Sequence, residues 1–188
     1  MEKSYLMREN AEAIYIHIPF CQRKCNYCDF LSFPAMEQQD RYIQALKKEL
    51  GMVASWEKIH PKTIFIGGGT PSLLEDSLLE SLLQTVEQYF VTDALEEYTM
   101  EINPGTVTSK KLEIMYHYRV NRLSIGVQSD KEEQLQQLGR IHTFAQAEET
   151  VYMARKCGFT NINLDFMYGL PNQTVEQWGK TLQHALTL

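Results

Sequence analysis

The sequence predicts an α/β fold, a partial, open (βα) barrel of about five parallel strands. Five short apolar runs alternate along the chain with segments whose apolar residues recur at helical spacing. This alternation is typical of parallel strands joined by right-handed helical crossovers. No G-x-G-x-x-G accompanies the runs, so the pattern favours a barrel-type fold over a dinucleotide-binding fold. The 188 residues suffice for one domain, and no linker divides them.

The expected strands and helices follow one another in a simple order. Strands are expected at 14–18, 63–66, 98–102, 122–127 and 162–166, and helical segments at 36–53, 74–90, 109–118, 143–157 and 174–188. Residues 130–138 are expected to form a turn. The strand runs are apolar without clear alternation, so we expect strands that are covered on both faces.

Local signals mark the ends of the last two helices. Thr143 with Gln146 has the pattern of a capping box, Gln177 lies three residues after Thr174 in the same way, and Gly158 is typical of a helix stop.

The last helical segment reaches the end of the chain, where the pattern would lead to a sixth strand. We therefore expect residues 1–188 to be the amino-terminal part of a longer protein, with the sixth strand missing from this chain. The strand at 162–166 would then be an edge, and an exposed parallel edge invites self-association.

Composition restricts the possible partners and compartment. The net charge is −6 without a long basic block, which argues against nucleic acid as a partner. No apolar run reaches transmembrane length. Four cysteines, three of them in one loop, favour a reducing, cytoplasmic environment in which thiolates bind metal. The fourth, Cys157, is expected to be a small buried apolar residue.

Cys21, Cys25 and Cys28 form a C-x3-C-x2-C triplet just after the first apolar run. Pro19 ends that run, which places the cysteines in the loop past the carboxyl end of the strand. Three thiolates in one loop can bind three irons of a four-iron cluster and leave the fourth iron open to a cofactor or substrate.

Two other interpretations of the triplet stay open. A structural zinc site needs four ligands, and the fourth would come from His17, His60 or Cys157. A disulfide with a leftover thiol is the second alternative. It is less favoured because disulfide scaffolds are typically shorter, secreted chains.

Each expected strand ends next to a polar or glycine-rich group. In parallel barrels the active site lies at this end of the strands. The groups are the cysteine triplet, Gly67-Gly68-Gly69-Thr70-Pro71, Glu101 with Asn103-Pro104-Gly105, Gln128, and Asp165 before Tyr168-Gly169-Leu170-Pro171.

Each group also has a purely structural interpretation. The glycines can form a tight turn, or offer bare backbone to a close ligand. Glu101 and Asp165 can be solvated charges, or acceptors for ribose hydroxyls and an ammonium group. Gln128 can be a structural amide, and Arg140 a surface charge or a carboxylate ligand. His17 is more typical of a core histidine with satisfied hydrogen bonds than of a metal ligand.

The cysteine triplet, with Tyr27 before its last cysteine, resembles the cluster motif of the radical S-adenosylmethionine (SAM) superfamily. Further motifs resemble the oxygen-independent coproporphyrinogen III oxidase group and its heme-chaperone subgroup. They are Tyr-Ile-His-Ile-Pro-Phe-Cys at 15–21, Gly-Gly-Gly-Thr-Pro-Ser at 67–72, Glu-Ile-Asn-Pro-Gly at 101–105, Ser-Ile-Gly-Val-Gln-Ser at 124–129 and Asn-Leu-Asp-Phe-Met-Tyr-Gly-Leu-Pro at 163–171.

The resemblance implies a [4Fe–4S] cluster on Cys21, Cys25 and Cys28, and SAM on the open iron. One electron from the cluster would cleave SAM to methionine and a 5′-deoxyadenosyl radical, so an electron donor is an implied partner. By the same resemblance Tyr15, Gly68 and Glu101 would contact SAM. The same pocket, which can hold a second SAM in the oxidases, would be lined by Tyr27, Gly69, Thr70, Gln128, Arg140 and Asp165.

One departure from the oxidases favours the chaperone subgroup. The oxidases carry a further cysteine two places after the third cluster ligand, where this chain has Phe30. The resemblance therefore implies binding of heme and its delivery to acceptor proteins, with the carboxyl-terminal half of the longer protein contributing. The alternatives are a coproporphyrinogen III oxidase of porphyrin biosynthesis and, from another class, a zinc-stabilised α/β binding domain.

Catalysis by this chain stays open at this point. Any reaction would be radical SAM oxidoreductase chemistry of the coproporphyrinogen dehydrogenase type. We expect the 188 residues alone not to form protoporphyrinogen IX, because a radical intermediate needs a closed, dry site.

Overall fold

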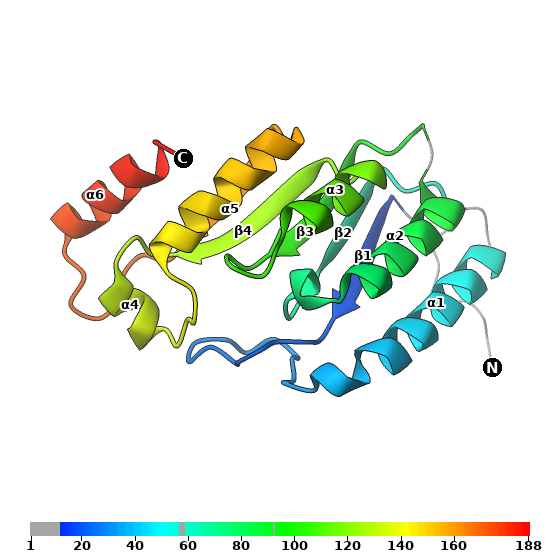
Figure 1. The fold of residues 1–188 in the computed structure, drawn as a ribbon, viewed down its shortest axis with the longest axis horizontal. Helices are drawn as coiled ribbons and strands as arrows, with labels where there is room; N and C mark the ends of the chain where they lie inside the picture. Colours follow the sequence, from blue (N-terminus) through cyan, green and yellow to red (C-terminus); the bar gives the residue numbers. More distant parts are fainter. Residues whose placement is uncertain (1–11, 57–58, 92) are drawn as a thin grey trace.

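The computed structural model describes residues 12–56, 59–91 and 93–188 (Figure 1). Five strands form one sheet in the order β1-β2-β3-β4-β5, and every neighbouring pair is parallel, as predicted. The strands are β1 Ala13–Ile18, β2 Thr63–Gly68, β3 Glu97–Ile102, β4 Arg122–Gln128 and β5 Asn161–Phe166. The helices are α1 Gln39–Trp56, α2 Asp76–Phe90, α3 Ser109–His117, α4 Glu132–Gln137, α5 Phe144–Cys157 and α6 Val175–Ala185.

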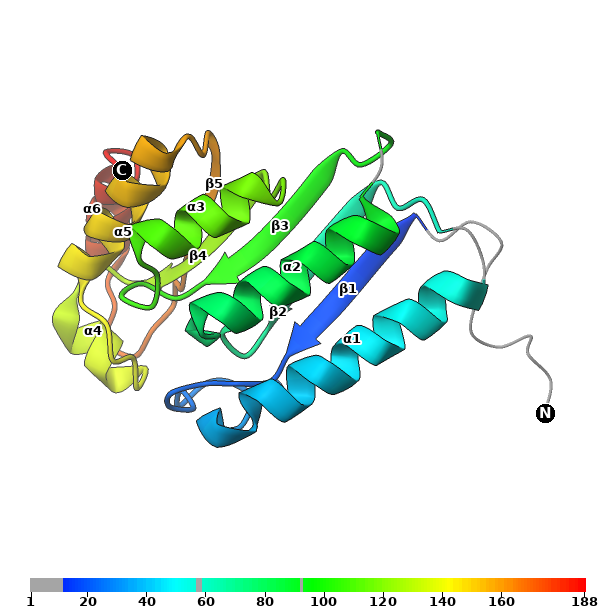
Figure 2. The same cartoon turned by 45° about the vertical axis from the view of Figure 1, so that its right-hand side comes forward.

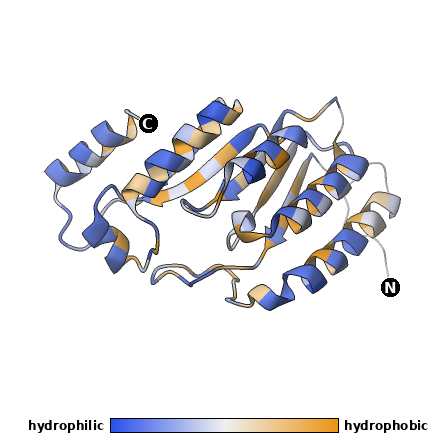
Figure 3. Ribbon diagram, viewed as in Figure 1, coloured by the Kyte–Doolittle hydropathy of each residue, from blue (hydrophilic) through white to orange (hydrophobic). Residues whose placement is uncertain are grey.

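The helices α1, α2, α3 and α5 lie along one face of the curved sheet (Figures 1 and 2). Alternate strand residues point toward these helices, where burial of apolar side chains stabilises the fold. Figure 3 shows the same division, with apolar residues on the strands and polar residues on the exposed sides of the helices. The core between the layers includes Ile16, Ile18, Ile64, Ile66, Met100, Leu123, Ile125 and, from the helices, Ile43, Leu82, Val86, Leu112 and Val151.

The opposite face of the sheet is not covered by helices in the same way, so the prediction of strands buried on both faces is wrong for β1 and β5, whereas β3 and β4 are buried at most of their positions. Tyr15 on this face is 57% exposed, His17 and Glu101 are partly exposed, and Asp165 is exposed. The inner positions are mostly polar, while the outer positions carry Ile, Leu and Met. Tyr15 and Phe65 are large, mainly apolar side chains at inner positions of β1 and β2. Their presence masks the alternation of apolar and polar residues in the sequences of these two strands.

The structure confirms the predicted helix caps. Thr143 and Thr174 each begin a helix with a full capping box, completed by Gln146 and Gln177. Gly158 ends α5 in the left-handed conformation, at φ 108°.

Several boundaries differ from the prediction, by one to three residues each. α1 begins at Gln39 and α2 at Asp76, because Met36–Gln38 and Pro71–Leu73 form separate 3-10 turns before them. The segment expected as a turn at 130–138 contains α4, a helix of six residues.

β5 is an edge strand, as expected. Among the described residues, no helix combines the length and apolar character needed to cross a membrane.

Tyr98 supplies a test of the packing. Its ring is fully buried under the helices, and its hydroxyl has no hydrogen-bond partner among the described residues. We expect Tyr98→Phe to leave the free energy of unfolding unchanged or to raise it by about 1–3 kcal/mol, because an unpaired buried hydroxyl costs that much. Urea unfolding followed by circular dichroism measures this.

The matched control is Tyr42→Phe. The hydroxyl of Tyr42 donates to the carbonyl of His17 at 2.7 Å, so its loss should lower the free energy of unfolding by about 1 kcal/mol. A similar loss in Tyr98→Phe would contradict the prediction.

Candidate functional site

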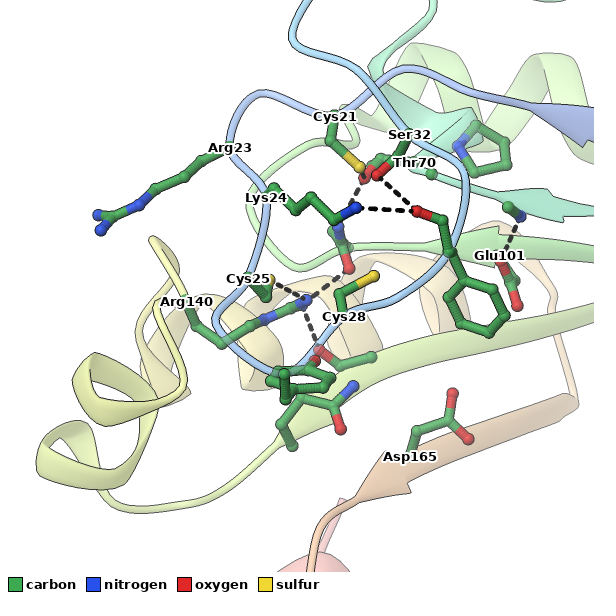
Figure 4. A pocket seen from close by; sticks show the side chains of 18 of the residues that line it. Cys21, Arg23, Lys24, Cys25, Cys28, Ser32, Thr70, Glu101, Arg140 and Asp165 are labelled. Carbon is green, nitrogen blue, oxygen red and sulfur yellow. Dashed lines mark hydrogen bonds between the residues drawn. The ribbon is translucent and has the colours of Figure 1, made fainter.

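One cavity of about 560 Å³ lies at the carboxyl ends of the strands (Figure 4). The parallel register places Gly68 beside Ile18, Glu101 beside Ser124, and Gly126 beside Asp165. Residues far apart in the sequence therefore share one rim. Of the site residues expected from the sequence, those that line the cavity are Cys21, Cys25, Tyr27, Cys28, Gly68, Gly69, Thr70, Glu101, Gln128, Arg140 and Asp165.

The cysteine loop is fixed at both ends. Near its start, the amide of Cys21 donates to the carbonyl of Phe33 at 3.1 Å, and Phe33 donates to Pro19 at 2.7 Å. At the far side, both the backbone amide and the side-chain amide of Asn26 donate to the last carbonyls of α4, those of Leu138 and Gln137, at 2.9 Å each. These helix-terminal carbonyls have no partner within the helix, so the short α4 serves as an anchor for the loop.

The glycine turn after β2 allows this loop to approach the sheet closely. Gly68 has φ 115°, and a Cβ there would lie 2.5 Å from the ring of His17. A Cβ on Gly69 would lie 2.6 Å from the carbonyl oxygen of Phe20. The amide of Gly69 instead donates to Ile18 at 2.8 Å. Close packing against His17 of β1 and against the backbone at Phe20, just before the cysteine loop, thus explains two of the glycines without any ligand.

A chain of hydrogen bonds under the loop connects two of the cysteines. The Cys21 thiol lies 3.6 Å from the hydroxyl of Thr70, which accepts a hydrogen bond from Asn103 at 2.8 Å. Asn103 in turn accepts from Arg140 at 2.7 Å, and Arg140 also donates to the Cys25 sulfur at 3.6 Å. The guanidinium therefore holds the Cys25 side of the loop against the ends of the strands.

His142 completes the environment of Arg140. The Arg140 Nε donates to His142 Nδ1 at 3.3 Å, and Nη2 donates to the carbonyl of Gly126 at 2.7 Å. Nε2 of His142 donates to the carbonyl of Val127 at 3.1 Å, which fixes the neutral tautomer. Sequence patterns gave no signal for His142 or for Asn26.

Two carboxylates face the cavity from the inner face of the sheet. Burial raises the pKa of Glu101, and the negative charge of Asp165 raises it further. The amide of Gly68 donates to the Glu101 carboxylate at 2.9 Å and lowers this pKa, which opposes the effect of burial. Asp165 accepts from Ser124 at 3.1 Å and from Asn163 at 2.7 Å. Both carboxylates are oriented acceptors for hydroxyl or ammonium groups in the cavity.

Gln128 reaches the rim through an irregular backbone. Its φ is 69°, rare for a residue with a side chain, and the pairing of β4 with β5 shifts register between Gly126 and Gln128. Such irregularities commonly redirect a side chain beside a functional site.

The two candidate tyrosines differ in their positions. Tyr27 lines the cavity, and burial raises its pKa to about 12, so it is neutral at physiological pH. Tyr15 is not among the residues that line the cavity. Nε2 of His17 donates to the carbonyl of Leu31 at 2.8 Å, so Nδ1 of the neutral ring is an acceptor. The hydroxyl of Tyr15 therefore donates to His17 Nδ1, at 3.1 Å.

His17 is therefore a satisfied histidine, but it lies on the inner face of the sheet rather than in the apolar core. Cys157 is partly buried against the core at the end of α5, and burial raises the pKa of its thiol.

The donor set fits a cluster better than a single metal ion. The thiols of Cys21, Cys25 and Cys28 are free and partly exposed. Within the described residues, no three His, Cys, Asp or Glu side chains are grouped closely enough to hold one ion. Zinc requires four ligands around one point, whereas each cysteine of a four-iron cluster binds a different iron. The loop could thus hold an iron–sulfur cluster beside the cavity.

The state of His142 supplies a prediction about pH. Burial and the charge of Arg140 lower its pKa from 6.5 to about 4. Between pH 6.5 and 4 the unfolded chain binds the proton and the native protein does not, so the free energy of unfolding falls as the pH falls through this window. When the pH falls from 7 to 5, we expect the free energy of unfolding of the parent to fall by about 2 kcal/mol more than that of His142→Gln. Urea unfolding of both proteins at the two pH values measures it, and a pH-independent difference would contradict it.

Comparisons with known proteins agree with this geometry. The sequence matches the Radical SAM superfamily over residues 15–185. It is 44% identical to the heme chaperone HemW of Escherichia coli, over 94% of this chain and 47% of the relative, and 38% identical to HemW of Bacillus subtilis, over 94% and 48%. The chain thus spans about half the length of these curated relatives.

A solved structure shares the fold over nearly the whole chain. The radical SAM enzyme coproporphyrinogen III oxidase (HemN) of Escherichia coli superposes with a TM-score of 0.86 at 29% identity, over 96% of this chain and 42% of that one. The chain therefore belongs to the radical SAM superfamily, in the group that includes HemW and HemN.

Proposed function

We propose that this chain is a radical SAM domain that holds a [4Fe–4S] cluster on Cys21, Cys25 and Cys28. The observation that carries the proposal is the position of the three free thiols on one side of the cavity, opposite the oriented carboxylates of Glu101 and Asp165. When bound, the cluster supplies an electron and an open iron at which SAM can bind. Residues of this chain bind and orient the ligand.

SAM is the proposed ligand of the cavity. The backbone of Gly68 and Gly69, the hydroxyl of Thr70 and the amide of Gln128 line it together with the two carboxylates. They offer acceptors for ribose hydroxyls and for the ammonium group, and Arg140 offers a guanidinium for a carboxylate. Tyr15 is left out of this set because it lies outside the cavity lining.

For the whole protein we propose the role of a heme chaperone, which binds heme and delivers it to acceptor proteins. Similarity to HemW supports this role, and so does Phe30. Phe30 lines the cavity and is 66% exposed, where the oxidases have a cysteine. The second candidate is a coproporphyrinogen III oxidase, favoured by the fold shared with HemN.

The cluster is tested by anaerobic reconstitution. We expect about four irons and an equal amount of acid-labile sulfide per chain. Cys25→Ala should reduce this loading severely because it removes one ligand. Cys157→Ala, the matched control on α5, should load like the parent. Equal loading of the Cys25→Ala variant and the parent would refute the proposed ligand set, and stoichiometric zinc in place of iron would refute the cluster.

The two roles are separated by product analysis of the full-length protein. With cluster, SAM and reductant present, we expect it to shift the Soret band of added heme and to release no protoporphyrinogen IX from coproporphyrinogen III. Chromatography of the porphyrins measures the second outcome. Decarboxylated product at a rate well above a Cys25→Ala control would assign the oxidase role instead.

A further inference from the structure

Lys111 lies in the first turn of α3, behind the wall of the cavity at the carboxyl ends of the strands. Its ammonium donates to the carbonyl of Ser72 at 2.8 Å and to the carbonyl of Thr106 at 3.4 Å. Ser72 belongs to the 3-10 turn after β2, and Thr106 to the loop between β3 and α3. Lys111 itself does not line the cavity, but its ammonium joins the two loops that supply Thr70 and Asn103 to the lining.

This position is unfavourable for a cation unless nearby acceptors compensate its charge. The amino-terminal end of a helix carries partial positive charge, which repels a lysine in the first turn. Lys110 forms an ion pair with Asp76 at 3.1 Å, whereas Lys111 forms no ion pair within the described part of the chain. Asp76 and Glu75 attract its charge from a greater distance, yet burial lowers the pKa of Lys111 overall. The two loop carbonyls are thus the direct acceptors that compensate this charge.

The same two loops are joined a second time, by the hydroxyls of Ser72 and Thr106. The Thr106 hydroxyl donates to the carbonyl of Asn103 at 2.6 Å. A hydroxyl has one hydrogen, so in the bond between the two hydroxyls Ser72 is the donor and Thr106 the acceptor. The Ser72 oxygen accepts from the backbone amide of Asn103 at 3.3 Å. Ser72 is fully buried, so bulk water cannot replace these partners, and each bond has one direction.

Asn103 is held through its backbone and its side chain at once. Its backbone amide donates to Ser72, and its carbonyl accepts from Thr106. Its side-chain amide donates to Thr70 at 2.8 Å, and its side-chain oxygen accepts from Arg140 at 2.7 Å. The side chain therefore cannot turn without releasing Thr70 or Arg140, and both of these line the cavity. The orientation of two cavity residues thus depends on contacts that begin at Lys111.

We propose that Lys111 is a positioning residue for the ligand of the cavity. It holds the turn after β2 against the loop after β3 and so keeps Asn103 in place. Asn103 in turn orients the Thr70 hydroxyl and the Arg140 guanidinium toward the ligand. Lys111 makes no contact with the ligand itself. The inference rests on the proposed function, because it takes SAM as the ligand whose carboxylate Arg140 would meet.

The first arm of the test needs no cluster. Lys111→Met removes the ammonium and keeps an apolar stem, Lys111→Arg restores donors for the two carbonyls, and Lys110→Met removes the same charge from the same turn as a control. Amide hydrogen exchange of residues 68–74 and 103–108 measures how firmly the two loops are held. We expect exchange there to be about tenfold faster in Lys111→Met and close to that of the parent in the other two variants. Exchange in α1 should be unchanged in all of them.

The second arm measures SAM binding to the reconstituted protein by equilibrium dialysis, at equal iron content. We expect Kd to rise about tenfold for Lys111→Met, to stay within about threefold of the parent for Lys111→Arg, and to be unchanged for Lys110→Met. A lysine that only stabilised the fold would lower the free energy of unfolding of Lys111→Met and leave the Kd of its folded form unchanged.

An unchanged Kd in Lys111→Met, equal weakening in Lys110→Met, or unchanged exchange in the two loops would overturn the positioning role. If Lys111→Met does not fold, Thr106→Val removes the hydroxyl that joins Ser72 to Asn103 and is expected to give the same two results. A parent that assembles no cluster or binds no SAM would instead overturn the proposed function, while the exchange measurement would still decide whether Lys111 holds the two loops.

Discussion

The hydrogen bonds that join Thr70, Asn103 and Arg140 constrain the whole carboxyl rim. They begin at the end of β2, pass the end of β3 and reach the loop before α5, and both ends meet a cysteine thiol. Thr70 is almost fully buried, so its hydroxyl is satisfied inside the protein rather than by bulk water. The ends of the strands therefore help to fix the positions of Cys21 and Cys25, together with the hydrogen bonds that the loop makes through its own residues.

Burial of one face of the sheet makes this rim possible. The core lies between the strands and α1, α2, α3 and α5, so the inner face is free to carry polar groups such as Glu101, Asp165 and Ser124. Their carboxylates and hydroxyl are paired with one another or with a backbone amide, which limits the cost of partial burial. Strand residues thus form one part of the cavity wall, where their positions are more rigid than those of the loop residues that complete it.

Local patterns in the sequence were sufficient for the strands, the capping boxes and the cysteine motif, because each depends on residues close together in the chain. The rim could be predicted as well, since parallel strands bring their carboxyl ends together. The faces of the sheet could not, because Tyr15 and Phe65 extend the apolar runs on the inner side. The roles of Asn26 and His142 depend on distant partners. Gln137, one partner of Asn26, lies 111 residues away, and no short pattern encodes such a contact.

Arg140 connects the two sides of the cysteine loop, and this position has a consequence for the chemistry. Its guanidinium donates to Cys25, to Asn103 and to the carbonyl of Gly126, while His142 stays neutral beside it. A cation that donates a hydrogen bond to a ligating sulfur stabilises added negative charge on a cluster, and so favours its reduced state. The same guanidinium lines the cavity, where a carboxylate would compete for its charge. With a cluster on the cysteine loop, this side chain would couple occupation of the cavity to the ease of reduction of the cluster.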